Sequence, residues 1–492
     1  MRRALVIVAA GSALAACTLE PPYVRPTPAI PQTWPAGAAY PSSQAGASAE
    51  PLPSLSYREV FRDPHLQAII DRALAGNQDL RAAMANVEIA RAQYRVQRAQ
   101  LLPSIEATAG ATESHGPITV GGSNGTQTRL SQTARSYVAD VGFTAFELDL
   151  FGRLRSLSHA AQAQYLASEA GVRAARLTLV GETAAAYLTL AADRSLLAIA
   201  EDTQTSAGKT VELTRARLAG GIAPRTDVRQ AETLLEQAQS DVASLTTQVA
   251  QDRNALELLV GGPVADDELP GSVEEVDGRL AEVPAGLDSH ILLRRPDVVE
   301  AEYRLRAANA QIGAARAAFF PAISLTGLAG AASPQLSALF AGRNSTWQVG
   351  GNVAQTLFAG GANVGNLALA KGERDLAVAQ YQKSVQTAFR EVADALARRG
   401  TIKDQLTAQT GLEAAATDSY NLEVARYREG VDPYLNTLDA QRTLYGARRS
   451  LAATRLIEAA NLVTLYQSLG GDQLVDALPA PRLAKAPGKS RG

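Results

Sequence analysis

The sequence predicts a mixed α and β membrane protein that contains two internal structural repeats, each with two β-strands and a very long helical hairpin. Three observations support this fold class. Segments of the first half recur in the same order in the second half, short segments alternate apolar and polar side chains, and two very long stretches contain no proline. Alternation with a period of two is typical of strands, and long proline-free stretches are typical of helices.

Composition excludes several classes of protein. The 492 residues include 47 basic and 49 acidic side chains, so the net charge of −2 disfavours nucleic-acid binding, which depends on basic surfaces. Hydrophobic residues make up 46% but aromatic residues only 5%, a balance that suits alanine-rich helices packed closely together. One Cys and four His are too few for a Cys/His zinc site. We therefore expect no metal and no cofactor.

The N-terminus has the pattern of a secretory signal peptide over residues 1–16. Arg2 and Arg3 precede a short apolar run, and Leu-Ala-Ala stands before Cys17. The run is too short to span a bilayer. Cys17 occupies the place of the acylated Cys in bacterial lipoproteins, so we expect a mature chain that begins at Cys17 and carries palmitate-like acyl groups. The alternative is a signal peptide with an incidental Cys.

The next segment, residues 17–55, is rich in proline, alanine and serine. Proline fixes φ and removes a hydrogen-bond donor, so this segment cannot form a helix or a central strand. It is expected to be an extended strap that leads away from the lipid. Thr18, rather than Asp, follows Cys17, and by resemblance to bacterial lipoproteins this indicates sorting to the outer membrane.

An internal duplication accounts for most of the chain. Residues 79–105 align with 297–323, and the Pro103 and Pro321 that end these segments coincide. Further pairs are residues 221–224 with 430–433 and residues 261–262 with 470–471. We therefore predict a first repeat over 56–262, a linker over 263–290, a second repeat over 291–471 and a disordered tail over 472–492.

Each repeat is expected to begin with a helix that proline ends and to continue with two strands. The helices are predicted over 66–102 and 296–320, and the strands over 105–112, 137–145, 322–329 and 345–357. In the last strand Trp347, Val349 and Val353 share one face. Each strand has about ten residues, which suits a tilted transmembrane strand. Extra residues between Pro103 and Val141, with Gly116-Pro117 and a glycine-rich run at 121–125, are predicted to form a longer loop.

A long helical hairpin follows the strands in each repeat. The first is predicted over 156–218 and 226–260, and the second over 363–428 and from the turn at 430–433 to Leu469. A continuous helix over 156–218 would reach about 95 Å at a rise of 1.5 Å per residue. Apolar residues recur at three- and four-residue steps, which indicates coiled-coil-like packing.

Four strands cannot close a barrel, and an open strand edge would leave its N–H and C=O groups without partners in lipid. Closure therefore requires other copies of the chain. Three copies would supply twelve strands, an even number within the range of outer-membrane barrels, and twelve helices around one axis would form a tube. These arguments favour a barrel with a tube but do not choose three copies over four.

Six ordered motifs resemble the TolC-like outer membrane factor family, in its NodT-type lipoprotein efflux branch. The motifs are residues 22–26 (PYVRP), 61–66 (FRDPHL), 147–153 (ELDLFGR), 292–297 (LLRRPD), 307–313 (AANAQIG) and 434–442 (YLNTLDAQR). The resemblance covers nearly the whole mature chain. Phe146 departs from it, because relatives often have Trp there, and either aromatic residue can anchor a barrel rim.

The resemblance implies a homotrimer whose twelve-stranded outer membrane β-barrel continues into a periplasmic α-helical barrel. The protein would be the passive exit duct of a tripartite efflux pump for drugs or other toxic small molecules. Its partners would be a periplasmic adaptor (membrane fusion) protein, an inner membrane transporter of the resistance-nodulation-division type and outer membrane lipid. Two alternatives stay open, a duct for type I protein secretion and a coiled-coil envelope lipoprotein without a channel.

The hairpin turns are the first candidate site. In the family such tips touch the adaptor and close the tunnel. The corresponding residues here are Arg217, Leu218, Gly220, Gly221, Gly430 and Val431. The alternative is that the glycines only supply the positive φ of a tight turn.

The tunnel constriction is the second candidate site. Asp439 matches a family position that lines it, and Leu435 lies one helical turn earlier on the same face. Three symmetry-related carboxylates would repel one another and favour cations. Asn436 replaces a second acidic residue of some relatives. Tyr427 and Arg426 are expected to hold neighbouring hairpins together, whereas the alternative pairs Asp439 with Arg442 or Arg426 on the helix surface.

An enzyme is the rival from another class, and nothing in the sequence favours it. No glycine-rich phosphate loop and no nucleophile elbow are present. The four histidines lie in unrelated segments, at His65, His115, His159 and His290. We therefore do not expect an enzyme.

Overall fold

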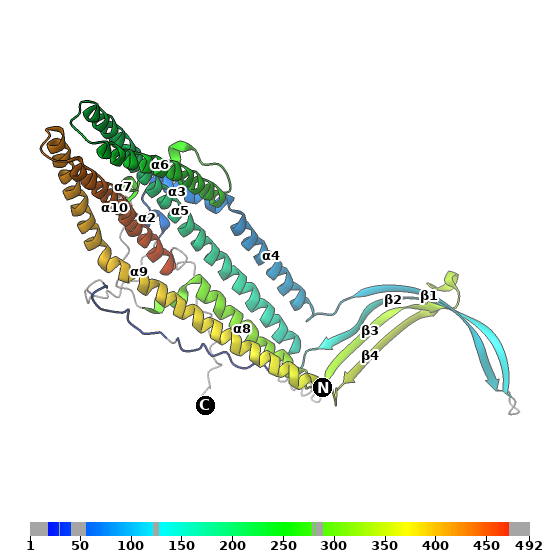
Figure 1. Cartoon of the computed structure of the whole chain (residues 1–492). Coiled ribbons are helices and arrows are strands. Elements are labelled where there is room, and N and C mark those ends of the chain that lie inside the picture. The colour runs from blue at the N-terminus through cyan, green and yellow to red at the C-terminus, as the bar shows by residue number, and fades with distance from the viewer. Residues whose placement is uncertain are drawn as a thin grey trace, which may run out of the picture. The chain divides into compact units, whose positions relative to one another are not determined.

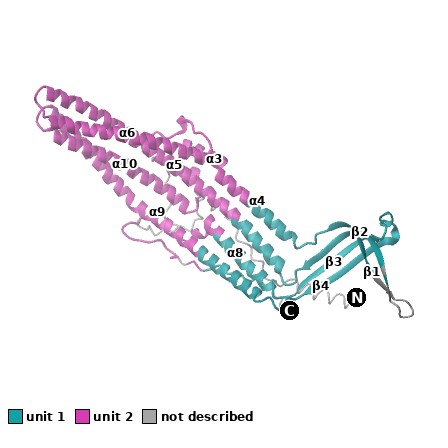
Figure 2. Ribbon diagram, turned by 45° about the vertical axis from the view of Figure 1, so that its right-hand side comes forward, with its two compact units in different colours: residues 1–26, 87–167, 301–380 teal, residues 27–86, 168–300, 381–492 magenta. Residues whose placement is uncertain are grey.

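The computed structural model describes residues 18–28, 30–40, 56–121, 127–277, 280 and 289–471. The predicted signal peptide, Cys17 and the tail from residue 472 lie outside the described residues. Segments from both halves of the sequence combine into two compact units (Figure 2). One unit contains residues 1–26, 87–167 and 301–380, and the other contains 27–86, 168–300 and 381–492.

The first unit contains a four-stranded antiparallel sheet with the strand order β1-β2-β3-β4 (Figure 1). The strands are β1 (Glu106–Gly121), β2 (Gln127–Leu148), β3 (Ala322–Ser333) and β4 (Ser345–Ala354). Two short 3₁₀ turns, η3 (Leu336–Ala338) and η4 (Gly342–Asn344), lie between β3 and β4. Within the described residues β1 pairs only with β2 and β4 only with β3.

The first strand pair is longer than predicted. β1 has 16 residues and β2 has 22, and Gly116 and Pro117 pair with Gln132 and Ser131 inside the ladder instead of forming a loop. Within the single chain β1 lies at the edge of the sheet, where the missing N–H of proline breaks no second ladder. Most of the glycine-rich run at 121–125 lies outside the described residues.

The two faces of the sheet differ as the alternating pattern predicts. The cross-strand row Ala107, Val141, Ala329 and Trp347 lies on the same face as Val349. Trp347 and Val349 are 79% and 76% exposed in the single chain. The opposite face carries polar residues of β4, namely Thr346, Gln348 and Asn352. Along β4 and the row of Trp347, the sheet therefore has one apolar face and one polar face.

The long hairpins are present and match each other in length. α5 (Arg153–Ala219) and α9 (Ala362–Arg428) have 67 residues each, and they are followed by α6 (Arg225–Val260) and α10 (Tyr434–Ser468). The order of helix, two strands and hairpin occurs twice along the chain (Figure 1). None of the described helices is long and apolar enough to cross a membrane.

The helix predicted over 66–102 is interrupted, so this prediction was wrong. Two helices, α3 (Pro64–Gly76) and α4 (Gln78–Ala99), meet at Asn77, which has an extended conformation. The Asn77 side chain accepts a hydrogen bond from the Leu80 N–H at 2.9 Å and donates one to the Leu259 carbonyl at 3.0 Å. Asn77 therefore caps α4 and also attaches it to the end of α6. A short helix, α2 (Tyr57–Val60), precedes α3.

The segment between the repeats contains η1 (Asp266–Glu268), α7 (Val273–Asp277) and η2 (Ser289–Arg294), and α8 (Pro296–Ala317) follows. Arg295, at the junction of η2 and α8, is buried. Its guanidinium donates to the Ser468 carbonyl at 2.8 Å and forms ion pairs with Asp297 and Glu391, each at 2.9 Å. The charged motif around Pro296 thus has a structural role, because it connects α8, α9 and the end of α10.

The strap is docked at its start. Arg25 and Arg306 each place a guanidinium nitrogen 2.7 Å from the Glu302 carboxylate, and the Tyr23 hydroxyl donates to the same carboxylate at 3.2 Å. Arg306 also lies 4.8 Å from the Tyr23 ring centroid. Nearby, Arg316 donates to the Leu19 carbonyl at 3.1 Å. The side chain of Glu302 is only 6% exposed, so this carboxylate is the buried centre of the attachment.

A later part of the strap packs within the second unit. Trp34 stacks on Phe389 with ring centroids 5.1 Å apart. The Ser289 hydroxyl lies 2.9 Å from the carbonyl oxygens of Pro31 and Gln32. No helix or strand occurs in the described residues 18–28 and 30–40, as the proline content predicts.

Candidate functional site

The two hairpin turns share one backbone design. α5 ends with the Ile222 N–H bonded to the Arg217 carbonyl, and α9 ends with the Val431 N–H bonded to the Arg426 carbonyl. Gly221 and Gly430, one residue earlier in each turn, have φ values of 72° and 75°. This is the Schellman ending of a helix, which places a residue with positive φ just beyond the helix and therefore favours glycine.

Arg217 connects the two turns. Its guanidinium donates to the Tyr427 carbonyl at 2.7 Å and lies 4.5 Å from the centroid of the Tyr427 ring. A hydrogen bond and a cation–π contact thus join the end of α5 to the end of α9. The sequence predicted six tip residues together, namely Arg217, Leu218, Gly220, Gly221, Gly430 and Val431. The structure adds that the Arg217 side chain binds Tyr427 of the same chain.

Aromatic and aliphatic residues pack behind this contact. Tyr427 and Tyr434 lie 5.5 Å apart between ring centroids and belong to one buried cluster with Val211, Leu234 and Leu438. Neither tyrosine hydroxyl has a hydrogen-bond partner within the described part of the chain. Burial raises the pKa of the Tyr427 hydroxyl above its ordinary value.

Arg426 lies on the outside of the second turn. It forms an ion pair with Asp432, and this pairing lowers the pKa of the Asp432 carboxyl. Both groups belong to the same turn, so the interaction braces the turn itself. A pairing of Arg426 with Asp439, which the sequence left open, is not found among the described residues.

Leu435 and Asp439 share an outward face of α10. Leu435 is 49% exposed, Asp439 is exposed, and Asn436 and Arg442 extend the same stripe. The opposite face carries the buried Tyr434 and Leu438. Where the chain is described, the Asp439 carboxylate forms no ion pair, either with Arg442 or with another cation. This stripe is therefore available to face a tunnel axis or another copy of the chain.

Polar contacts farther along the hairpins also join the two repeats. The Tyr445 hydroxyl donates to the Asp241 carboxylate at 2.6 Å, and burial together with this carboxylate raises the pKa of Tyr445 to about 12. Arg448 lies 2.7 Å from the Asp202 carboxylate and 3.4 Å from that of Glu413. Sequence reasoning missed these contacts, because the partners in the different repeats are separated by more than two hundred positions.

The described residues contain no group of three or more His, Cys, Asp or Glu side chains arranged to hold a metal ion. The features of the site are instead two tight turns, one cation–π contact between them and an outward stripe with a carboxylate. Such an arrangement can contact a partner or narrow a passage.

Comparisons with known proteins identify the family. The sequence model of the family described as outer membrane efflux protein matches residues 69–262 and again residues 287–471. The chain belongs to the outer membrane efflux protein family. This confirms the predicted family, and it is a family of efflux proteins rather than of enzymes.

Curated relatives include an outer membrane protein of an efflux pump and a further outer membrane protein. TtgC of Pseudomonas putida, a toluene efflux pump outer membrane protein, is 43% identical over 460 residues, which cover 93% of each chain. The outer membrane protein OprJ of Pseudomonas aeruginosa is 39% identical over 458 residues, again covering 93% of each chain. The predicted role in outer membrane efflux is thereby confirmed.

A solved structure of the family agrees with the fold. The open state of the MtrE outer membrane channel of Neisseria gonorrhoeae matches with a TM-score of 0.81 and 34% sequence identity. The match covers 93% of this chain and 99% of that one. The predicted fold class is therefore confirmed for the single chain.

Proposed function

We propose that three copies of this outer membrane efflux protein form a closed exit duct. The observation that carries the proposal is the open sheet, in which β1 and β4 each have one edge that pairs with no other strand of the described chain. In lipid those edges must find partners, and β4 of one copy beside β1 of the next satisfies both. Three sheets of four strands then close into a twelve-stranded barrel.

The membrane side of the duct follows from the sheet and the strap. The face with Trp347 and Val349 would contact lipid, and the polar face would line the barrel. Acyl groups on Cys17 would anchor the chain in the inner leaflet, with the docked strap beside α8. Two or more acyl chains suffice for a stable anchor.

The helical hairpins would form the periplasmic tube and meet a periplasmic adaptor at the tips formed by residues 217–221 and 430–431. An inner membrane transporter of the resistance-nodulation-division type would supply the energy and choose the cargo. TtgC belongs to a toluene efflux pump, and this supports small, toxic, mostly apolar compounds as cargo.

A constriction near the tips would restrict flow in the resting state. Leu435 and Asp439 would face the axis from each copy, so that three apolar side chains and three carboxylates form successive rings. A carboxylate ring favours cations and repels anions. The cation–π contact between Arg217 and Tyr427 would hold the two hairpins of one chain together while the ring is closed.

Two measurements on the purified full chain test the proposal. We expect migration at the size of a trimer that heating converts to the monomer, and stable ion-conducting channels in planar bilayers. A monomer without pore activity in detergent and in bilayers would contradict the duct. In a deletion strain, susceptibility to solvents, dyes and antibiotics should rise, and the gene supplied in trans should restore resistance.

A further inference from the structure

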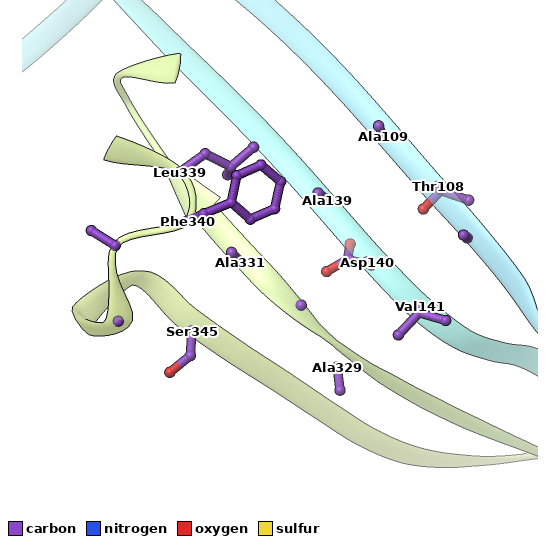
Figure 3. A pocket seen from close by; sticks show the side chains of 14 residues that line it. Thr108, Ala109, Ala139, Asp140, Val141, Ala329, Ala331, Leu339, Phe340 and Ser345 are labelled. Carbon is purple, nitrogen blue, oxygen red and sulfur yellow. The ribbon is translucent and has the colours of Figure 1, made fainter. Parts of the chain in front are cut away.

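Phe358 is a large aromatic side chain that the described part of the chain leaves uncovered. It lies between β4 and α9 and is 88% exposed. Two other exposed aromatic side chains are part of features at the sheet itself. Trp347 lies on its apolar face, and Phe340 lines, with Leu339, a cavity beneath the connection between β3 and β4 (Figure 3). Phe358 lies beyond the other end of β4, where the strands lead into the helices.

The internal duplication identifies the counterpart of Phe358 in the first repeat. Phe358 follows β4 and aligns with Phe151, which follows β2, and each of them stands directly after a Leu. Leu102 precedes β1 and aligns in the same way with Phe320, which precedes β3. Each repeat therefore has one large apolar side chain just before its first strand and one Phe just after its second strand.

Within one chain two of these side chains are in contact. Phe151 of the first repeat stacks on Phe320 of the second, with ring centroids 4.7 Å apart and an angle of 21° between the ring planes. The contact continues the ladder of β2 and β3, since Leu148 pairs with Ile323 and each Phe lies three residues beyond that pair. The stack therefore covers the junction at which the second strand of one repeat adjoins the first strand of the other.

The remaining two side chains lie at opposite edges of the sheet. The strand order is β1-β2-β3-β4, so Leu102 before β1 and Phe358 after β4 are separated by the whole width of the sheet. Leu102 is 71% exposed, and Phe358 is exposed still further. The contact that Phe151 and Phe320 make within the chain is thus open to this second pair only between two copies of the chain.

We propose that Phe358 of one copy packs on Leu102 of the next copy, as the counterpart between copies of the stack within the chain. The inference rests on the proposed function, because it requires β4 to lie beside β1 of the next copy. Contact between a Phe and a Leu removes a large apolar area from solvent, which favours association. Three such contacts per trimer would cover the junctions between copies where the barrel joins the helices.

The same equivalence assigns the register between copies. Leu148 pairs with Ile323 in the chain. Their counterparts in the duplication are Gln355 and Ile105. Gln355 of one copy would therefore lie opposite Ile105 of the next, and the residues before Gln355 would run antiparallel to β1 from that point.

Chemical crosslinking of the assembled protein tests the contact. The paired variant Leu102→Cys with Phe358→Cys is purified in detergent and treated with a short bismaleimide, and the products are separated after heating. The paired variant Phe151→Cys with Phe320→Cys calibrates the reagent, because these two positions are in contact within one chain. The single variants retain Cys17 and show whether it contributes to any product.

We expect covalent dimers and trimers from the pair at 102 and 358. The pair at 151 and 320 should be linked within one chain and keep the size of a monomer. Leu102→Cys with Phe340→Cys should give no covalent oligomer, because Phe340 is equally exposed but lies at the other end of the sheet. If the pair at 102 and 358 gives only monomers while the pair at 151 and 320 reacts, the proposal is wrong. Oligomers in equal yield from the pair at 102 and 340 would also overturn it.

The lifetime of the trimer gives a second test. Phe358 and Leu102 are exposed in the single chain, so their replacement by alanine should act on assembly rather than on the fold of the chain. Phe358→Ala should convert from trimer to monomer at least about tenfold faster on heating, because a large apolar contact is lost three times per trimer. Adding Leu102→Ala should change the rate little further, because the two side chains share one contact. The matched control Phe340→Ala should keep the rate of the unmodified chain.

The outcomes separate this contact from the proposed duct. An unmodified chain that migrates as a monomer and forms no pores would overturn the duct and the contact together. Trimers with pores, in which Phe358→Ala keeps the unmodified rate and the pair at 102 and 358 gives no oligomers, would overturn only the contact. In that case lipid rather than the next copy would cover Phe358.

Discussion

The candidate residues near the hairpin tips fall into two groups. Arg217 and Arg426 have partners in their own chain, Tyr427 and Asp432, and so stabilise the turns. Leu435 and Asp439 point outward from α10 instead. The first group can be explained from one chain alone. The second group is expected to act only where other copies of the chain are present.

The outward pair is expected to restrict conduction. Replacing Leu435 and Asp439 together by alanine removes a bulky ring and a charged ring, so single-channel conductance in planar bilayers should rise at least about twofold and cation preference should fall. Asp418→Ala with Leu422→Ala is the matched control, because this exposed pair has the same spacing on α9. Conductance unchanged in the first variant would exclude these residues from the constriction.

Glu302 makes the docking of the strap dependent on pH. Although burial opposes ionisation, Arg25 and Arg306 hold the pKa of its carboxyl below the ordinary value. A depressed pKa means that the stabilisation is fully present above the unfolded carboxyl value of about 4.3 and is lost as the pH falls through the folded value. The strap should therefore stay docked at neutral pH and loosen only in strong acid.

Glu302→Gln should loosen the strap at neutral pH. Loss of about 2 kcal/mol of charge-assisted hydrogen bonding corresponds to roughly 30-fold faster amide exchange in residues 18–28. Glu88→Gln is the control, since its ion pair with Arg91 lies on an exposed helix surface and contributes little. Unchanged exchange in Glu302→Gln would show that backbone contacts alone hold the strap.

At the scale of elements, local patterns predicted the helical hairpins within a few residues, because their proline-free stretches and glycine-containing turns are short-range signals. They failed at Asn77, whose partner at Leu259 is distant in sequence. The strands of the first pair were predicted too short, since Gly116, Pro117 and the glycine-rich run at 121–125 are local signals of a loop. The contact of Arg217 with Tyr427 was equally out of reach, because no local pattern pairs them.

Two helix ends approach each other more closely than side chains permit. A Cβ atom on Gly76 would lie 2.4 Å from the Val260 carbonyl oxygen, so Gly76→Ala must separate α3 from α6. We expect it to destabilise the folded chain by about 2 kcal/mol or more, measured as a lower thermal midpoint. Gly262→Ala is the control, because open space surrounds that position. Equal midpoints for both variants would contradict the close approach.

At the scale of the whole molecule, duplication supplies each chain with two strand pairs and two hairpins, and the single sheet leaves β1 and β4 available for other copies. Family membership and the match to a channel structure agree with such closure. Sequence could predict that copies must meet, but the edges that meet become definite only once the strand order is known.

Disulfide crosslinking can identify which strand edges pair between copies of the chain. The only natural Cys is Cys17, so in a Cys17→Ser background one cysteine placed in β1 and a series placed in β4 report on contacts between copies. Oxidation should give covalent dimers and trimers at the positions in register. Cysteines facing each other in β2 and β3, such as Ala139 and Ala331, should link only within one chain. Intermolecular products from β2 and β3, or none from β1 and β4, would contradict the closure.

The docked strap also limits how far Cys17 can lie from the rest of the chain. The Leu19 carbonyl is held by Arg316, only two residues after Cys17. Two residues reach at most about 7 Å. A lipid on Cys17 would therefore enter the bilayer close to one fixed position on each chain. In a trimer, three such attachment points would fix the depth and the tilt of the assembly in the membrane.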